Sequence, residues 1–193
     1  SDPFIWGKGR LGNCAIRRNH DVIEEKFYLT DRIAEEANDF MEQHQDEPFF
    51  LYVPFLAPHT PFQATSAYFD KLDHIKDRNK RVYNAMIWQL DDAVGSIMQK
   101  LEELDLTKNT LVIFMSDNGG ATYTNATDNA PLKGGKFTNF EGGLNIPFMM
   151  SWSGQLDSGM VSSNPVIATD VFSTVASLLG LTKFPKQLDG QNL

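Results

Sequence analysis

Apolar residues recur at helical spacing in the stretch from Thr30 to about Gln45. They lie three or four positions apart with acidic residues between them, which predicts an amphipathic helix. Its expected apolar face comprises Ile33, Ala34, Ala37, Phe40 and Met41. Thr30 or Asp31 is expected to cap the first turn, because either side chain can accept a hydrogen bond from a backbone N–H group there.

A longer apolar stripe predicts a second helix. Its apolar positions are Met86, Leu90, Ala93, Val94, Ile97, Met98, Leu101 and Leu104. The polar residues outside the stripe are Arg78, Lys80, Gln89, Gln99 and Lys100. A final helix is predicted from Val166 to Leu179, with Gly180 placed to end it.

Short continuous apolar runs predict strands between these helices. Residues 49–53, between Pro48 and Pro54, and residues 111–115 are apolar throughout, which is typical of strands covered on both faces. A third strand is expected over residues 146–152. Helices that alternate with such strands predict an α/β fold with a mostly parallel sheet flanked by helices. Residues 1–27 show no period and are interpreted as an irregular N-terminal segment, so the α/β domain is expected over residues 28–193.

Composition places the chain among ordinary globular proteins and argues against some classes of partner. Hydrophobic residues make up 41% and charged residues 22% of the 193 residues, which argues against a largely disordered chain. Seventeen Lys and Arg against 25 Asp and Glu give a net charge of −8, so no nucleic-acid partner is expected. No apolar run approaches the roughly 20 residues of a membrane-spanning helix, so no membrane partner is expected either.

Polar residues follow two of the predicted strands, at the carboxyl ends where α/β proteins bind ligands. His59 lies in a loop that Pro58 and Pro61 stiffen, and its imidazole can bind an anionic oxygen or move a proton. Asp117 and Asn118 follow the strand at 111–115, and their carboxylate and amide oxygens suit Ca²⁺ or Mg²⁺. The residues alone leave simpler alternatives open, namely a histidine held by one hydrogen bond and an Asp-Asn-Gly-Gly turn.

Two lysines lie in a glycine-rich segment, Leu132-Lys133-Gly134-Gly135-Lys136. The paired glycines allow backbone to approach an anion closely, although the segment lacks the pattern of a nucleotide-binding P-loop. Two lysines in a solvated loop are the alternative. Asp91 and Asp92 are neighbours on the second predicted helix, where adjacent side chains point about 100° apart, so this pair is assigned to structure.

Together these segments resemble the sulfatase family, the formylglycine-dependent members of the alkaline phosphatase superfamily, from about Tyr28 to the end of the chain. The motifs occur in the family's order. They are residues 48–53 leading into 57–61, Asp91-Asp92-Ala93-Val94-Gly95, residues 110–120, residues 132–136, Glu141-Gly142-Gly143, Ile146-Pro147, Asp170 and Asp189-Gly190. The resemblance implies an alkaline phosphatase-like fold, here as the central to C-terminal part of an incomplete sulfatase domain.

The resemblance also implies a role for each candidate residue. Asp117 and Asn118 match two ligands of a divalent cation, usually Ca²⁺, with Mg²⁺ as the alternative. His59 and Lys136 match catalytic residues that bind the sulfate group, and Lys133 is a poorer match for sulfate binding. A cation and a lysine would neutralise charge on the sulfuryl oxygens while a histidine assists at the bridging oxygen.

One part of a sulfatase centre has no match in the sequence. The family's nucleophile lies in a Cys-or-Ser, any residue, Pro, Ser, Arg motif whose first residue becomes formylglycine, and two metal-binding aspartates precede it. Cys14-Ala15-Ile16-Arg17-Arg18 keeps only the Cys and the final Arg, so Cys14 is interpreted as an ordinary thiol. The formylglycine is therefore expected upstream of this chain, and the chain alone is expected to be inactive.

The resulting hypothesis is that the chain is a portion of a sulfatase, a sulfuric ester hydrolase that acts on a sulfated carbohydrate or an aryl sulfate. Two alternatives stay open. One is a phosphodiester or phosphonate hydrolase of the same superfamily, and the other is a non-catalytic fragment that binds an anionic glycan. The family resemblance implies a periplasmic, secreted or lysosomal location.

Overall fold

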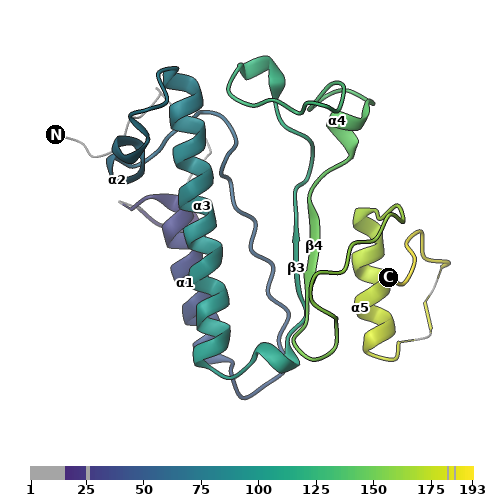
Figure 1. Cartoon of the computed structure of the whole chain (residues 1–193). Helices are drawn as coiled ribbons and strands as arrows, with labels where there is room; N and C mark the ends of the chain where they lie inside the picture. The colour runs from purple at the N-terminus through teal and green to yellow at the C-terminus, as the bar shows by residue number, and fades with distance from the viewer. Residues whose placement is uncertain (1–15, 25–26, 182, 185) are drawn as a thin grey trace. The chain divides into compact units, whose positions relative to one another are not determined.

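The structure is a computed structural model that describes residues 16–24, 27–181, 183–184 and 186–193, so Cys14 lies outside the described residues. The chain divides into two compact units, one that extends to Leu156 and one over Asp157–Leu193, and each is described by itself. The helices and strands of the first unit are β1 (Arg17–Arg18), β2 (Asp21–Val22), α1 (Leu29–Gln43), α2 (Ser66–Phe69), α3 (Arg78–Glu103), β3 (Val112–Met115), α4 (Glu141–Leu144) and β4 (Phe148–Ser151) (Figure 1). Short 3-10 turns lie at Asp70–Leu72, Thr107–Asn109 and Thr122–Thr124.

Helices α1 and α3 lie side by side in the first unit (Figure 1). The buried residues of α1 follow a helical period and form the face that the sequence pattern predicts; they are Thr30, Ala34, Ala37 and Met41. The helix is therefore confirmed, but its expected cap is wrong. Tyr28 is the N-cap residue, Thr30 is buried inside the first turn, and the Asp31 carboxylate accepts hydrogen bonds from α3 instead.

Helix α3 is also confirmed, and it begins at a cap that the Asp77 side chain forms with the backbone N–H of Lys80. One polar residue outside its apolar stripe is also buried, since Gln89 is only 1% exposed. Its amide nitrogen lies 2.8 and 2.7 Å from the two carboxylate oxygens of Asp31, and its amide oxygen accepts from the Thr65 hydroxyl at 3.1 Å. Burial is tolerated because these bonds satisfy the amide.

The sheets differ from the expected parallel arrangement. The described residues form two sheets of two antiparallel strands each, β1 with β2 and β3 with β4. The prediction of a mostly parallel sheet is wrong for this part of the chain. Parallel neighbouring strands need a crossover connection, usually a helix, that carries the chain back to the start of the first strand. Residues 116–147 instead form a long loop with one short α-helix, and this loop begins and ends at the same end of β3, so β4 runs antiparallel to it. Strands β1 and β2 lie in the segment expected to be irregular.

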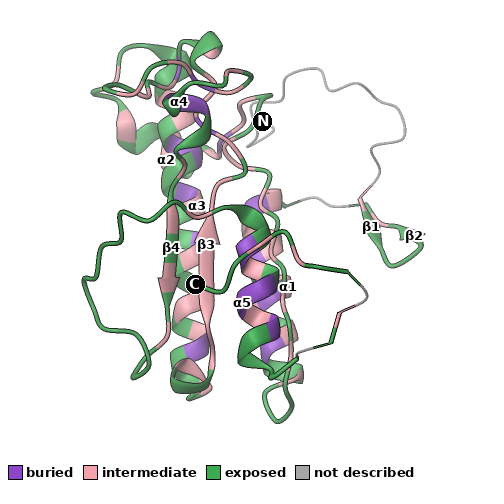
Figure 2. Ribbon diagram, turned by 90° about the vertical axis from the view of Figure 1, so that its right-hand side faces the viewer, coloured by how far each residue is buried: buried purple, intermediate pink, exposed green. Residues whose placement is uncertain are grey.

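Residues 48–56 form neither helix nor strand, although the sequence predicts a strand at 49–53. One side of this segment lies on α1, where the rings of Phe49 and Phe40 are 5.8 Å apart edge to face. The other side exposes Phe50, Tyr52 and Leu56. The segment is therefore covered on one side only, and no described strand pairs with it. Strand β3 is likewise only half-buried along its length (Figure 2).

The second unit contains α5 (Ala168–Leu178), which confirms the final predicted helix. Its first turn is held by the Asp170 carboxylate, which accepts from the backbone N–H groups of Ile167 at 2.8 Å and Gln191 at 2.7 Å. Gly180, at a φ of +69°, follows the helix end as expected. None of the helices in the described ranges is both long and apolar enough to cross a membrane.

Candidate functional site

His59 lies on an exposed loop that is anchored to α3. The loop turns through a hydrogen bond from the His59 backbone N–H to the Leu56 carbonyl at 2.8 Å. Ala57 and Phe62, on either side of His59, pack against a buried cluster formed by Ala64, Val82, Ala85 and Met86. The apolar neighbours of His59 therefore fix the position of the loop, while the imidazole itself is exposed.

The His59 imidazole contacts the side chain of Lys136, 77 positions away, with Nε2 and Nζ 2.9 Å apart. The other ring nitrogen, Nδ1, lies 2.6 Å from the Thr60 carbonyl oxygen. A carbonyl can only accept, so Nδ1 carries the proton that it donates there. In the neutral ring Nε2 is then the acceptor, and the Lys136 ammonium group donates to it. The structure thus brings together two residues that the sequence nominates separately.

The turn that follows β3 is hydrogen-bonded to the Lys136 segment. The Lys136 N–H donates to the Gly120 carbonyl at 3.0 Å, and the Gly119 N–H donates to the Gly143 carbonyl at 3.0 Å. Glycine is required at this approach, because a Cβ on Gly119 would overlap the backbone carbonyl of Gly142. Asp117-Asn118 and Lys136 are therefore held by a shared backbone network.

Asn129 reinforces this network, and sequence reasoning did not identify it. Its Nδ2 donates to the carbonyl oxygens of Gly120 and Gly134, both at 3.0 Å, and its Oδ1 accepts from the Gly120 N–H at 3.2 Å. These three bonds tie the turn after β3 to the segment that carries Lys136. Nothing in the sequence around Asn129 distinguishes it from other Asn residues of the loop.

Asp117 and Asn118 offer oxygen atoms that suit a hard cation. Asp117 is exposed, and no side chain in the described ranges hydrogen-bonds to its carboxylate. Asn118 uses its amide nitrogen for a long 3.4 Å bond to the Gly119 carbonyl, so its amide oxygen stays available. Two such residues could supply at most a part of the about six to eight oxygens that Ca²⁺ takes. The described part of the chain contains no group of three or more His, Cys, Asp or Glu side chains suited to a metal.

Among the described residues, the side chains of Lys133 and Asp92 make contacts other than with His59 or Lys136. The Lys133 ammonium lies over the Phe140 ring, 4.2 Å from its centroid, in a cation–π contact. Asp92 accepts a hydrogen bond from the Tyr68 hydroxyl at 2.7 Å. Burial, and then this bond, raise the pKa of Tyr68 to about 12. The bond from Tyr68 agrees with a structural role for Asp92. The Lys133 side chain contacts Phe140 instead of the candidate site.

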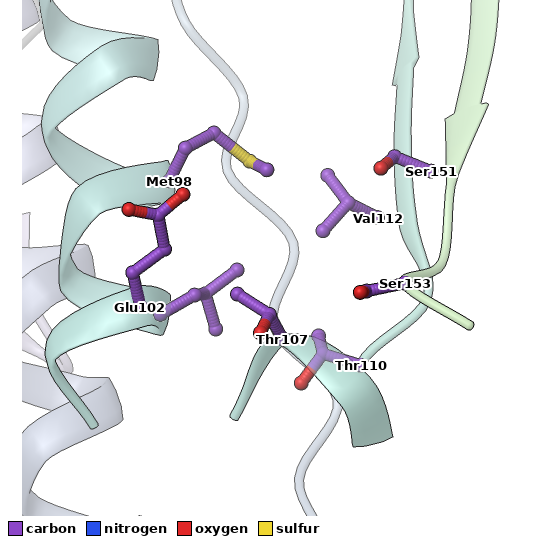
Figure 3. Close-up of a pocket in the computed structure, with 8 residues that line it drawn as sticks. Met98, Glu102, Thr107, Thr110, Val112, Ser151 and Ser153 are labelled. Atoms are coloured by element: carbon purple, nitrogen blue, oxygen red, sulfur yellow. The ribbon is translucent and has the colours of Figure 1, made fainter. Parts of the chain in front are cut away.

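A separate cavity of about 380 Å³ lies at the other end of β3. Met98 from α3 and Val112 from β3 point toward each other across it, and Thr107, Thr110 and Ser151 contribute hydroxyl groups (Figure 3). None of the candidate site residues that the sequence predicts lines this cavity.

Comparison with known proteins decides the family. The pattern of the family named Sulfatase matches residues 5–181. The chain belongs to the sulfatase family. Among curated sulfatases, human arylsulfatase D is 33% identical over 91% of this chain, and human N-acetylgalactosamine-6-sulfatase is 34% identical over 86%.

The chain spans only about 30% of the length of these curated relatives, 30% of the first and 31% of the second. A solved structure, that of Ps i-CgsB in complex with k-i-k-neocarrahexaose, superposes on 92% of the chain with a TM-score of 0.88 and 35% identity, and 40% of that protein is covered. The described residues therefore have the fold of part of a sulfatase domain.

Proposed function

We propose that this chain forms the sulfate-binding part of a sulfatase centre, in which His59 and Lys136 bind the sulfate group of a sulfate ester. The observation that carries the proposal is the 2.9 Å contact between His59 Nε2 and Lys136 Nζ. These groups come from distant segments, and both have hydrogen-bonding capacity that a sulfuryl oxygen can use.

The geometry suggests how the two residues act. When sulfate binds, one of its oxygens accepts the hydrogen bond that the Lys136 ammonium otherwise donates to His59 Nε2. His59 Nε2 then faces the anion, because the bond from Nδ1 to the Thr60 carbonyl holds the ring in place. In the imidazolium form of the ring, Nε2 carries a second proton in addition to the one on Nδ1, and it would donate that proton to the sulfate group, which is what assistance at the bridging oxygen requires.

Asp117 and Asn118 would hold a divalent cation, with Ca²⁺ preferred and Mg²⁺ the alternative. Such a cation supplies positive charge that stabilises negative charge on the sulfuryl oxygens. Two protein ligands make a partial site, so we expect weak binding by the chain alone. Formylglycine as nucleophile is proposed to come from a sulfatase segment upstream of these residues, in agreement with the missing motif.

A sulfated carbohydrate is the proposed substrate class. One relative is named for N-acetylgalactosamine, and one structural neighbour is a complex with k-i-k-neocarrahexaose. An aryl sulfate remains the second candidate because another relative is an arylsulfatase.

Calorimetric titration of the chain with inorganic sulfate, in the presence of Ca²⁺, tests the proposal. We expect Lys136→Ala to weaken sulfate binding about tenfold or more, since hydrogen bonds to charged groups contribute about 1.5–3 kcal/mol. Lys133→Ala is the matched control and should leave binding within twofold of the unsubstituted chain. Equal losses in both variants would contradict a site at Lys136.

Two further measurements separate the remaining alternatives. Tighter binding of inorganic phosphate than of sulfate would favour the phosphoester hydrolase. An assay with 4-nitrophenyl sulfate should show no turnover, and robust metal-dependent turnover by the chain would contradict the proposal that its nucleophile lies elsewhere.

A further inference from the structure

Two exposed aromatic rings lie beside the contact between His59 and Lys136. The rings of Tyr123 and Phe137 are stacked, with centroids 5.7 Å apart and planes inclined by 20°. Phe137 is 84% exposed and Tyr123 is 57% exposed. Phe137 directly follows Lys136, whose ammonium is 5.4 Å from the Phe137 ring centroid. We call Tyr123 and Phe137 the aromatic pair.

The backbone of Phe137 adds an independent observation. Its φ is +73°, a conformation that a bulky residue rarely adopts and that glycine tolerates best. The turn is closed by the bond from the Thr138 N–H to the Gly135 carbonyl at 3.0 Å, and a second bond joins the Gly135 N–H to the Thr138 hydroxyl at 3.0 Å. The fold therefore holds a strained, exposed phenylalanine where glycine would be easier to accommodate, and such strain is characteristic of functional sites.

We propose that the aromatic pair binds the ring of the substrate that carries the sulfate group, and that this ring is a pyranose. The inference rests on the proposed function of His59 and Lys136. A flat, apolar surface beside an ammonium group suits a ligand that combines an apolar ring face with an anionic substituent. A sulfated sugar and an aryl sulfate share this chemistry, and the sugar is favoured because the names of the relatives above point to carbohydrates.

Packing in a core does not explain the conformation of Phe137, because within the described residues the rings of the aromatic pair are exposed. The Phe137 ring contacts Tyr123, which is exposed, and Lys136, which is half-buried. A role in stability alone would favour glycine at position 137, because glycine relieves the unfavourable φ.

The test compares three ligands of the chain in the presence of Ca²⁺: galactose 4-sulfate, 4-nitrophenyl sulfate and inorganic sulfate. Dissociation constants come from NMR titrations of the unsubstituted chain, Phe137→Gly, Tyr123→Ala and Lys136→Ala. Phe172→Ala is the matched control, because Phe172 is 59% exposed and forms a ring pair with Phe184 in the other unit. Thermal melting should show that Phe137→Gly is at least as stable as the unsubstituted chain.

We expect Phe137→Gly and Tyr123→Ala to weaken galactose 4-sulfate binding about two- to tenfold, the range that aromatic contacts support. Inorganic sulfate should bind within twofold of the unsubstituted chain in both variants, and Phe172→Ala should change neither ligand. Lys136→Ala should weaken both.

Other outcomes overturn specific steps. Unchanged galactose 4-sulfate binding by Phe137→Gly refutes ring stacking, and equal weakening of inorganic sulfate shows that Phe137 acts by positioning Lys136. A larger loss for 4-nitrophenyl sulfate than for the sugar assigns the pair to aryl esters instead of pyranoses. Unchanged binding of all three ligands by Lys136→Ala refutes the proposed function but not the role of the rings, and a chain that binds none of the ligands refutes both.

Discussion

Asn129→Ala should loosen the segment that carries Lys136. The substitution removes three hydrogen bonds, two donated to the Gly120 and Gly134 carbonyls and one accepted from the Gly120 N–H. The Gly120 carbonyl keeps its bond from the Lys136 N–H, whereas the Gly134 carbonyl and the Gly120 N–H lose their hydrogen-bond partner among the described residues. At about 0.5–1.5 kcal/mol for each bond, with half-buried groups that water can partly reach, we expect the free energy of unfolding to fall by about 1.5–3 kcal/mol.

Asn129→Asp separates hydrogen bonding from side-chain volume. Aspartate has nearly the shape of asparagine, but it presents an oxygen to the Gly120 and Gly134 carbonyls where the amide donates. It should therefore destabilise the chain more than alanine does. Asn145→Ala is the matched control, since Asn145 is exposed and its side chain makes no hydrogen bond to the described residues.

Urea unfolding followed by circular dichroism gives the stability of each variant. Amide hydrogen exchange at Lys136 reports the local effect, and it should accelerate in both Asn129 variants but not in Asn145→Ala. The reasoning would be refuted if Asn129→Asp were as stable as the unsubstituted chain, or if exchange at Lys136 were the same in every variant.

Two further predictions concern carboxylates that accept hydrogen bonds. Gln89→Met should lower the free energy of unfolding by about 1–3 kcal/mol at pH 7, because it removes the donor to Asp31. Burial raises the pKa of the Asp31 carboxyl, and the Gln89 bond opposes that shift. More of Asp31 is protonated at pH 4 than at pH 7, and a neutral carboxyl needs the Gln89 donor less, so the loss of stability should be smaller at pH 4. Equal losses at both pH values would contradict this. Hydrogen bonds from the backbone N–H groups of Ile167 and Gln191 lower the pKa of Asp170 in the folded chain. The ionised carboxylate therefore stabilises the fold at pH values above the pKa of the unfolded state, near 3.8, and this stabilisation is lost as the pH falls through the lower pKa of the folded state. Asp170→Asn should therefore melt at a lower temperature than the unsubstituted chain at pH 7 and at a similar temperature near pH 2, and a constant difference would refute the assignment.

Periodicity predicted the elements that depend on local pattern. Helices α1, α3 and α5 lie where the spacing of apolar residues places them, and strands β3 and β4 lie within the strands predicted at residues 111–115 and 146–152. The family resemblance nominated His59 and Lys136, and the structure places them in contact. Their roles in sulfate binding, and those of Asp117 and Asn118 in cation binding, stay predictions.

The features that the sequence did not reveal depend on partners far away in the chain. Gln89 is polar and was placed outside the apolar stripe, but Asp31, 58 positions earlier, makes its burial favourable. The pairing of β3 with β4 depends on where a 32-residue loop returns, from Ser116 to Pro147, which apolar runs do not encode. Phe137 carries no sequence signal either, because its interest lies in a backbone conformation that glycine usually occupies.

The location of the candidate site follows from how its two sides are supported. His59 is fixed to the α3 side through the packing of Phe62, whereas Lys136 belongs to the loop between β3 and β4. The side-chain contact between them therefore joins segments with separate supports. An anion that bonded to both would strengthen this connection, since a ligand stabilises the arrangement that binds it. Glycine contacts and the Asn129 hydrogen bonds fix the main chain around Lys136. The proposed function requires only that the long Lys136 side chain exchange the imidazole for an oxyanion, while the backbone stays in place.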